Sequence, residues 1–357
     1  MSEAPANPVP VAIPTVTPAA PSATPVPVPA PANGLQRWWN SWVSPWRLKR
    51  MGILGMNCRN HDFIAAYNPR SLFPLVDNKL KTKLLAEEYE VATPKLFFVV
   101  NVQHEIAHIE DKLMALEAFA VKPAKGSGGK GILVIIGRRG DKFIKSSGAE
   151  ITIEDIRRHM TNALAGLYSL GGKPDVVIVE DLIQFDDYFK DYSYEGVPDI
   201  RIIIFKGYPV MAMLRLATHK SDGKANLHQG AVGVGLDIAT GCALKAVQHS
   251  KPVTHHPDTK RALNEIRIAD WRNWLLLASK CYEMTGLGYI GTDLVLDKVR
   301  GAQLLELNAR PGLAIQVANG RGLLPRLRHI ESLKERMHRT AEQRVDYVMK
   351  TFSADGL

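Results

Sequence analysis

The sequence predicts an α+β protein built of two lobes. Residues 289–296 and 304–308 are apolar runs of strand length on either side of a turn near 297–301, so they are predicted to pair as a hairpin. Two further strands, 119–123 and 132–136, flank a loop rich in glycine, and segments with helical spacing of apolar residues lie between the strands. A chain of 357 residues, 46% of them hydrophobic, can bury more than one core.

Three polar side chains interrupt the apolar hairpin: Asp293 on its first strand, and Glu306 and Asn308 on its second. Side chains alternate along a strand, so Glu306 and Asn308 share a face, and Asp293 is expected to point there too. Carboxylate and amide oxygens are the ligands that Mg²⁺ takes beside the phosphates of a nucleotide. An ordinary hairpin with surface charges would not explain these residues within runs of Leu, Val and Ile, so the pattern indicates a metal–nucleotide site.

Composition limits the class of protein. Residues 1–34 are almost wholly Pro, Ala, Val, Thr and Ser, which predicts a disordered tail, partly in polyproline II, and not a signal peptide. No run of about 18 apolar residues is present to span a bilayer. The three scattered cysteines favour a reducing cytoplasm over a disulfide framework. A net charge of +9 suits phosphate-binding enzymes as well as partners of nucleic acid or anionic membranes, and no DNA partner is expected.

A tryptophan-rich segment follows the tail. It spans residues 38–46 and is bordered by Arg37, Arg47, Lys49 and Arg50. Such a segment can dock at a membrane interface. Packing as a hydrophobic arm on the protein's own body is the favoured interpretation.

The elements before the glycine-rich loop alternate between helix and strand. Residues 77–88 are predicted to form a helix, because an Asp-Asn pair can cap its start and apolar residues follow at helical spacing. A strand over 96–100 and an amphipathic helix over 104–117 come next. The strand 119–123 then ends near Lys122.

The loop 124–131 contains four glycines and two lysines. A dinucleotide fingerprint or a Walker loop should lead from a strand into a helix, and a Walker loop also needs Ser or Thr after its Gly-Lys. Here Gly131 follows Lys130 and a strand comes next, so both interpretations are poor. The loop is predicted to be a flap whose backbone N–H groups close over phosphates, with Lys122 beneath it; a flexible hairpin turn is the alternative.

The order of elements resembles the ATP-grasp superfamily, and within it the RimK-related proteins similar to alpha-L-glutamate ligases. The resemblance covers roughly Gly52 to Leu324 and implies an ATP-grasp fold, in which two α+β lobes clamp Mg-ATP. The motifs that carry it are Leu54-Gly55-Met56-Asn57-Cys58-Arg59-Asn60, Asn68-Pro69-Arg70, Asp77-Asn78-Lys79, Val121-Lys122-Pro123, the glycine flap, Asn226-Leu227-His228-Gln229-Gly230 and Glu306-Leu307-Asn308-Ala309-Arg310-Pro311-Gly312.

The resemblance implies which residues bind ATP. The residues expected at the phosphates are Lys79 and Lys122, together with the flap residues Gly126, Ser127, Gly128, Gly129 and Gly131. Those expected at the adenine are Glu180 and the backbone of Asp181, Leu182 and Ile183, at the end of an apolar strand over 175–183. Asp186 or Asp187 is expected to hold the ribose.

The resemblance also implies the metal site and the chemistry. Asp293, Glu306 and Asn308 are expected to bind two Mg²⁺ ions, with Mn²⁺ as a substitute, and Arg215, Asn226 and Arg310 to face the transferred phosphoryl group. A carboxylate would attack the γ-phosphate of ATP, and an amine would attack the resulting acyl-phosphate to give an amide. Glutamate or another amino acid is a candidate substrate, with a peptide or a small molecule as acceptor.

The expected organisation has five parts. These are the tail 1–34, a shortened N-terminal segment 35–78, lobe 1 over 79–178, lobe 2 over 179–330 and a C-terminal helix 331–357. Related ligases carry a preceding α/β domain that helps to bind the acceptor, and the 35–78 segment is too short for one. A second subunit or a partner protein could therefore complete the acceptor site.

Two other classes of function compete with a ligase. His104-Glu105-Ile106-Ala107-His108 matches the HExxH pattern of zinc hydrolases, although no third ligand is evident nearby. A non-catalytic ATP-binding scaffold is the other alternative, but it would not need the complete set of metal ligands, lysines and Arg215. The basic run 321–344 could touch RNA or an acidic partner, and a solvated helix face is its default interpretation.

Overall fold

The computed structural model describes residues 44–126, 128–334 and 340–353. The tail 1–34, most of the tryptophan-rich segment and Ser127 lie outside the described residues. The chain divides into two units, Met1–Pro45 and Trp46–Leu357, and the second unit carries the sheets and the candidate site.

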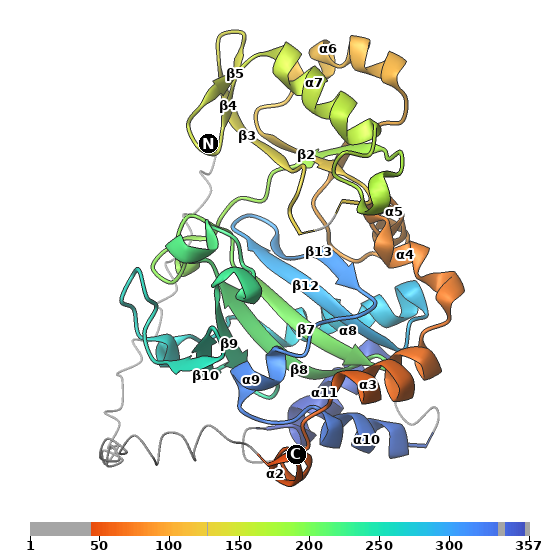
Figure 1. The fold of residues 1–357 in the computed structure, drawn as a ribbon, viewed down its shortest axis with the longest axis vertical. Coiled ribbons are helices and arrows are strands. Elements are labelled where there is room, and N and C mark those ends of the chain that lie inside the picture. Colours follow the sequence, from red (N-terminus) through yellow and green to blue (C-terminus); the bar gives the residue numbers. More distant parts are fainter. Residues whose placement is uncertain (1–43, 127, 335–339, 354–357) are drawn as a thin grey trace, which may run out of the picture. The chain divides into compact units, whose positions relative to one another are not determined.

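The first sheet has six strands, in the order β1-β6-β2-β3-β4-β5, and every pair in it is antiparallel (Figure 1). Its strands are β1 (Leu96–Val100), β2 (Phe119–Pro123), β3 (Leu133–Arg139), β4 (Lys142–Lys145), β5 (Glu150–Ile151) and β6 (Val177–Asp181). Helix α7 (Ile153–Leu164) packs on β2 and β6 through Ile156, Met160 and Ala163. This arrangement encloses the smaller of two hydrophobic clusters.

The second sheet has seven strands in the order β11-β10-β9-β8-β7-β12-β13, again antiparallel throughout. The strands are β7 (Asp199–Phe205), β8 (Tyr208–Leu216), β9 (Val232–Leu236), β10 (Ala243–Gln248), β11 (Lys251–Val253), β12 (Tyr289–Asp297) and β13 (Gly301–Asn308). Helices α8 (Trp271–Thr285) and α11 (Ala341–Thr351) pack on β8, while α9 (Ile315–Asn319) packs on β8, β9 and β10.

Short helices connect and flank the sheets. Before β1 come α2 (Pro45–Arg50), α3 (Met56–Cys58), the π-helical turn η1 (Arg59–Ala65), η2 (Arg70–Leu72), α4 (Pro74–Asp77) and α5 (Lys79–Glu88). Later segments are η3 (Gln103–His108), α6 (Glu110–Met114), η4 (Leu170–Gly172), η5 (Asp187–Phe189), η6 (His219–Ser221), η7 (Leu227–Gln229), η8 (Leu263–Glu265) and α10 (Leu324–Ser332). As predicted, α5 begins after Asn78, whose side chain accepts hydrogen bonds from Leu80 N and Lys81 N.

The predicted hairpin is confirmed as β12 and β13. Asp293 pairs with Glu306, and Gly291 pairs with Asn308, which places the three predicted metal ligands along one edge of the sheet. The register shifts after Asp293, because Leu294 pairs with Leu304 and leaves Leu305 as an extra residue. A bulge of this kind re-aims the neighbouring side chains.

The single helix predicted over 104–117 is wrong, since the structure has the 3₁₀ helix η3 followed by the short α6. Residues three apart eclipse one another in a 3₁₀ helix, so Ile106 and Ile109 face the same way. Both are buried in the smaller hydrophobic cluster with Leu113 of α6. The predicted burial of this apolar face is thus confirmed, although the helix is divided in two.

The structure describes only the end of the tryptophan-rich segment, residues 44–46. Helix α2 contains no buried residue. Packing of this segment on the protein's body stays a prediction, since residues 38–43 lie outside the described part of the chain.

Candidate active site

Two aspartates and two arginines meet on one face of β7, β8 and β12. The strand register sets Asp293 opposite Arg201, and Asp199 opposite Arg215. Arg201 donates to Asp293 through Nε at 2.7 Å and Nη2 at 2.5 Å, and Arg215 Nη2 lies 2.8 Å from Asp293 Oδ2. Arg215 also pairs with both oxygens of Asp199. The result is a balanced four-charge cluster, in which Asp293 is only 2% exposed.

The pKa values of the two carboxyl groups in this cluster shift in opposite directions. Burial opposes ionisation of Asp293, but Arg215 and Arg201 outweigh it and lower the pKa of Asp293 to about 2. Burial raises the pKa of Asp199 to about 6, although Arg215 opposes that change. Asp293 is therefore the carboxyl group that stays ionised, and Asp199 is the one that is protonated first as the pH falls.

Glu306 and Asn308 extend this polar face along β13. Asn308 Nδ2 donates to Asp293 Oδ2 at 3.3 Å, so its Oδ1 is the end that can accept a metal. Glu306 Oε1 lies 3.3 Å from Lys79 Nζ at the start of α5, and its side chain is 37% exposed. Lys79 also donates to Gly126 O at 2.6 Å. Lys79 of α5 therefore contacts both the flap and the β12–β13 hairpin.

A second cluster lies on β2, β6 and α5. Lys122 and Lys83 both pair with Glu180, Lys83 through Glu180 Oε2 at 2.9 Å, and the three side chains are 12%, 6% and 5% exposed. Burial opposes ionisation of Glu180, but the two lysines outweigh it and lower its pKa. Burial also lowers the pKa of Lys83 although Glu180 opposes that change. Two cations facing one carboxylate leave a positive excess, which an anion such as phosphate can neutralise.

The glycine flap joins β2 to β3 as predicted. Gly128, Gly129 and Gly131 all have a positive φ, a backbone conformation that residues other than glycine rarely adopt. At Gly131 a Cβ would also come within 2.4 Å of the Tyr168 ring. Gly131 O lies 2.9 Å from His159 Nε2 of α7, so the end of the flap is fixed to the sheet's covering helix.

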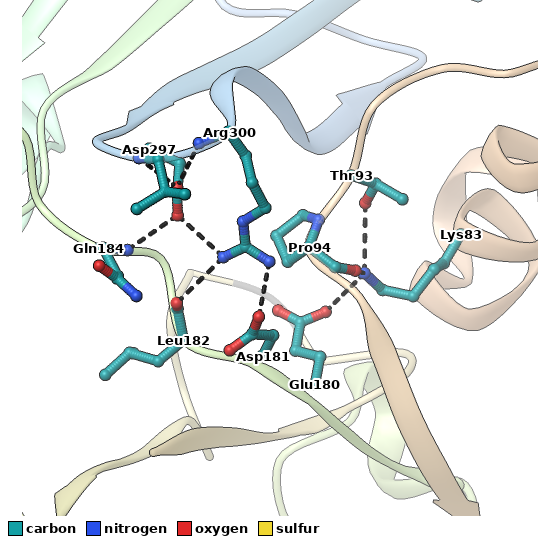
Figure 2. A network of polar contacts seen from close by, with 10 residues as sticks. Lys83, Thr93, Pro94, Glu180, Asp181, Leu182, Gln184, Asp297 and Arg300 are labelled. Atoms are coloured by element: carbon teal, nitrogen blue, oxygen red, sulfur yellow. Dashed lines mark hydrogen bonds and ion pairs between the residues drawn. The ribbon is translucent and has the colours of Figure 1, made fainter. Parts of the chain in front are cut away.

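The segment after β6 is held by Arg300 of the β12–β13 turn (Figure 2). Arg300 donates to Asp181 Oδ2 at 2.6 Å, to Leu182 O at 3.3 Å and to Asp297 Oδ2 at 2.9 Å. Asp297 also accepts from Gln184 N at 2.9 Å. The predicted adenine linker is thereby tied to the turn of the β12–β13 hairpin, and Lys83 and Glu180 lie beside it in the same view.

Several predicted site residues have their contacts elsewhere. Asn226 Oδ1 accepts from His228 N in its own turn. The guanidinium of Arg310 lies 5.1 Å from the centre of the Phe73 ring. Asp187 pairs with Lys298 at 2.7 Å on the surface, so a role in binding ribose would require that ion pair to open.

The HExxH residues serve a structural purpose. Glu105 Oε2 accepts from Asn101 N at 2.6 Å, which caps the start of η3. His104 and His108 are exposed, and the centres of their rings lie 5.3 Å apart. Across the described residues, no group of three or more His, Cys, Asp or Glu side chains is arranged to hold a metal ion.

The hairpin residues fit Mg²⁺ with one condition. Two carboxylates and an amide oxygen are the hard ligands that this ion takes. Glu306 and Asn308 would hold it through Oε1 or Oε2 and Oδ1. Asp293 could join them only after a guanidinium has moved, because both its oxygens accept from arginine.

Sequence reasoning missed Lys83, Arg201, Asp199 and Arg300. One signal was available for Lys83, which lies four residues after Lys79 and therefore on the same face of α5. Asp199 and Arg201 alternate along β7 and so point to one face of the sheet. Nothing in the local sequence marks Arg300, because its partners lie up to 119 positions away.

Comparison with known families identifies the chain. A family model described as "Sugar-transfer associated ATP-grasp" matches residues 58–332, which is more than half of the sequence. The protein therefore belongs to the sugar-transfer associated ATP-grasp family, and its fold is the ATP-grasp fold. No curated protein matches the chain in sequence.

Solved structures with a likeness to this chain are distant. D-alanyl-alanine synthetase A from Vibrio cholerae has 12% identity and a TM-score of 0.42, with 78% of this chain and 66% of that chain covered. D-alanine–D-alanine ligase from Bacillus anthracis, complexed with ATP, has 12% identity and a TM-score of 0.39, with 78% and 66% covered. The ATP-grasp ligase PsnB, complexed with a phosphomimetic variant of its minimal precursor, Mg and ADP, has 14% identity and a TM-score of 0.38, with 73% and 59% covered. The chain thus spans less than two thirds of the length of each of these proteins.

Proposed function

We propose that this protein is an ATP-dependent carboxylate–amine ligase that works through an acyl-phosphate. One observation supports it most directly. Lys79, from the segment that precedes the flap, meets Glu306, which lies opposite Asp293 on the candidate metal hairpin. A phosphate-binding lysine beside a hard-oxygen metal site is the combination that nucleotide phosphates need.

In this proposal ATP binds across the two polar clusters. Lys79, Lys83 and Lys122 neutralise the phosphates, and the flap residues Gly126–Gly131 close over the γ-phosphate. Glu180, Asp181, Leu182 and Ile183 provide the adenine contacts, and Asp187 the ribose contact. Two Mg²⁺ ions, or Mn²⁺ in their place, would be held by Glu306, Asn308 and Asp293, and would offset the charge of the phosphates.

The chemical steps need positioning more than a protein nucleophile. A substrate carboxylate oxygen attacks the γ-phosphorus, the bond to the bridging oxygen breaks, and ADP leaves with its electron pair. An amine nitrogen then attacks the acyl carbon, phosphate departs, and the amine loses a proton to solvent. We assign stabilisation of the transferred phosphoryl charge to Arg215, with Asn226 and Arg310 as further candidates.

The acceptor is proposed to enter a cavity of about 310 Å³ between η7 and α9. Leu227 lines it and packs against Gly233, the strand partner of Arg215. Ala314 lines it too and follows the turn after Asn308. This volume suits an amino acid or another small amine, and a second copy or a partner protein could add the remaining contacts.

The substrate class is open to a direct screen. Glutamate is included because of the RimK-related resemblance, and amino sugars because the family is described as associated with sugar transfer. We assign the reaction to the cytoplasm, because use of ATP and three free cysteines suit a reducing compartment. A non-catalytic ATP-binding scaffold remains the competing function.

Trapping with hydroxylamine tests the proposal. The protein is incubated with Mg-ATP, a mixture of carboxylic acids and hydroxylamine, and the products are measured as ADP and hydroxamate. Equal amounts of ADP and hydroxamate, both lost in Glu306→Gln, are expected. ATP binding with no ADP release in the presence of any acid, amine or amino sugar tested would favour the scaffold.

A further inference from the structure

We propose that the α2 arm, residues 44–51, docks this protein on the surface of an anionic lipid membrane. The arm lies outside the proposed catalytic machinery and is the segment whose chemistry the ligase function does not use. It also has the composition that membrane interfaces select.

The described residues of the arm expose apolar and cationic side chains together. Trp46 is 75% exposed, Leu48 38% and Met51 44%. A single exposed apolar residue needs no explanation, but three within six positions form a local patch. Arg47, Lys49 and Arg50 alternate with them, and no residue of α2 is buried.

The arm has a fixed base. Met51 O accepts a hydrogen bond from Gly322 N at 3.1 Å, and Gly52 O accepts one from Leu324 N at 3.1 Å, just before and at the start of α10. Gly52 has φ +66, and a Cβ there would meet Pro325 at 2.4 Å. The base of the arm is therefore held to α10, so membrane contact through the arm would hold the ligase lobe near the bilayer.

Charge and residue type identify the occupant. Between residues 37 and 51 the sequence carries four Arg or Lys, no Asp or Glu, and four of the protein's six tryptophans. Tryptophan partitions to the headgroup region of bilayers. Each nearby Lys or Arg adds roughly fivefold to affinity for an anionic surface. Among the described residues no helix is long and apolar enough to cross a membrane, so the proposed attachment is peripheral.

Co-sedimentation of the full chain with vesicles tests the proposal. One set of vesicles contains phosphatidylcholine and phosphatidylglycerol in equal parts, and the other contains phosphatidylcholine alone. The variants are Trp46→Ser and the triple change Arg47→Gln, Lys49→Gln, Arg50→Gln. The matched control is Arg138→Gln, Arg139→Gln, Lys142→Gln, which removes three exposed cations around the β3–β4 turn.

The proposal predicts binding to the anionic vesicles alone, weakened about a hundredfold by the triple change and severalfold by Trp46→Ser. The control should bind like wild type, and quenching of tryptophan fluorescence by brominated lipid should decrease in Trp46→Ser. Absence of binding, equal binding to both vesicle sets, or an equal loss in the control would overturn it. So would tight binding of single-stranded RNA that both arm variants abolish while the vesicles stay unbound, or self-association that depends on Trp46 without vesicle binding.

Discussion

A change at Glu306 is expected to abolish turnover without lowering the stability of the protein. Its side chain is partly exposed and its ion pair with Lys79 faces solvent, so the pair contributes less than about 1 kcal/mol to folding. Glu306→Gln should therefore unfold at the same urea concentration as wild type and release no ADP. Exposed Glu88→Gln on α5 serves as the control and should keep full turnover.

An unfolded Glu306→Gln protein would show that Glu306 is structural. Retained turnover by the folded variant would remove it from the metal site. The two outcomes are distinguished by circular dichroism recorded on the same sample as the ADP assay.

Asp297 connects local charge to stability. Burial opposes its ionisation, but hydrogen bonds from Arg300 and from backbone N–H groups outweigh burial and lower its pKa to about 2, against 3.8 for the free group. Since the folded-state pKa is the lower one, the stabilisation is complete above pH 4 and is lost as the pH falls from about 4 to about 2. The shift corresponds to about 2 kcal/mol at neutral pH.

Asp297→Asn should thus lower the free energy of unfolding by about 2 kcal/mol at pH 7, and the difference from wild type should shrink towards pH 2. Urea unfolding at several pH values measures it, with exposed Asp141→Asn as the unchanged control. A difference that stays constant with pH would mean that packing at the turn, and not the ionised carboxylate, stabilises the protein.

At the scale of elements, the flap depends on its anchored end. Gly131 has φ +75 and no room for a Cβ beside Tyr168, whereas Gly128 has φ +62 and open space around it. Gly131→Ala must therefore displace the ring or the backbone, while Gly128→Ala pays only a left-handed penalty of about 1 kcal/mol. The two variants form a matched pair.

We expect Gly131→Ala to weaken ATP binding by about tenfold, which corresponds to 1.4 kcal/mol, and Gly128→Ala to weaken it less. Titration calorimetry with Mg-ATP measures both. Equal losses would show that Gly131 has no special role in anchoring, and no loss in either would place the flap away from the nucleotide.

The elements also show how far sequence patterns extend. The apolar runs were enough to predict β1 and β2, although both pair with the distant β6. The β12–β13 hairpin could be predicted with its pairing, because its two strands are joined by a short turn. For 104–117 the pattern predicted the buried residues Ile106, Ile109 and Leu113 but not the division into η3 and α6. Arg300 and Lys83 were missed, since their partners in the site are brought together only by the fold.

At the scale of the whole molecule, two sheets contribute different halves of one candidate site. The six-stranded sheet provides the lysine–glutamate cluster and the flap, and the seven-stranded sheet provides the carboxylates, the amide and the arginines. The contacts that join these halves include Lys79 with Glu306 and Arg300 with Asp181. Lys79 pairs with Oε1 of Glu306, so Oε2 is the oxygen that can bind a metal ion while this contact persists.

Magnesium-dependent binding of ATP is the most direct test of this account. Isothermal titration of wild type, with and without Mg²⁺, is compared with Lys122→Ala and with exposed Lys142→Ala as the control. The account predicts binding only with Mg²⁺, lost in Lys122→Ala and kept in Lys142→Ala. Folded wild-type protein that binds no ATP, or that binds equally well without Mg²⁺ or without Lys122, would contradict it.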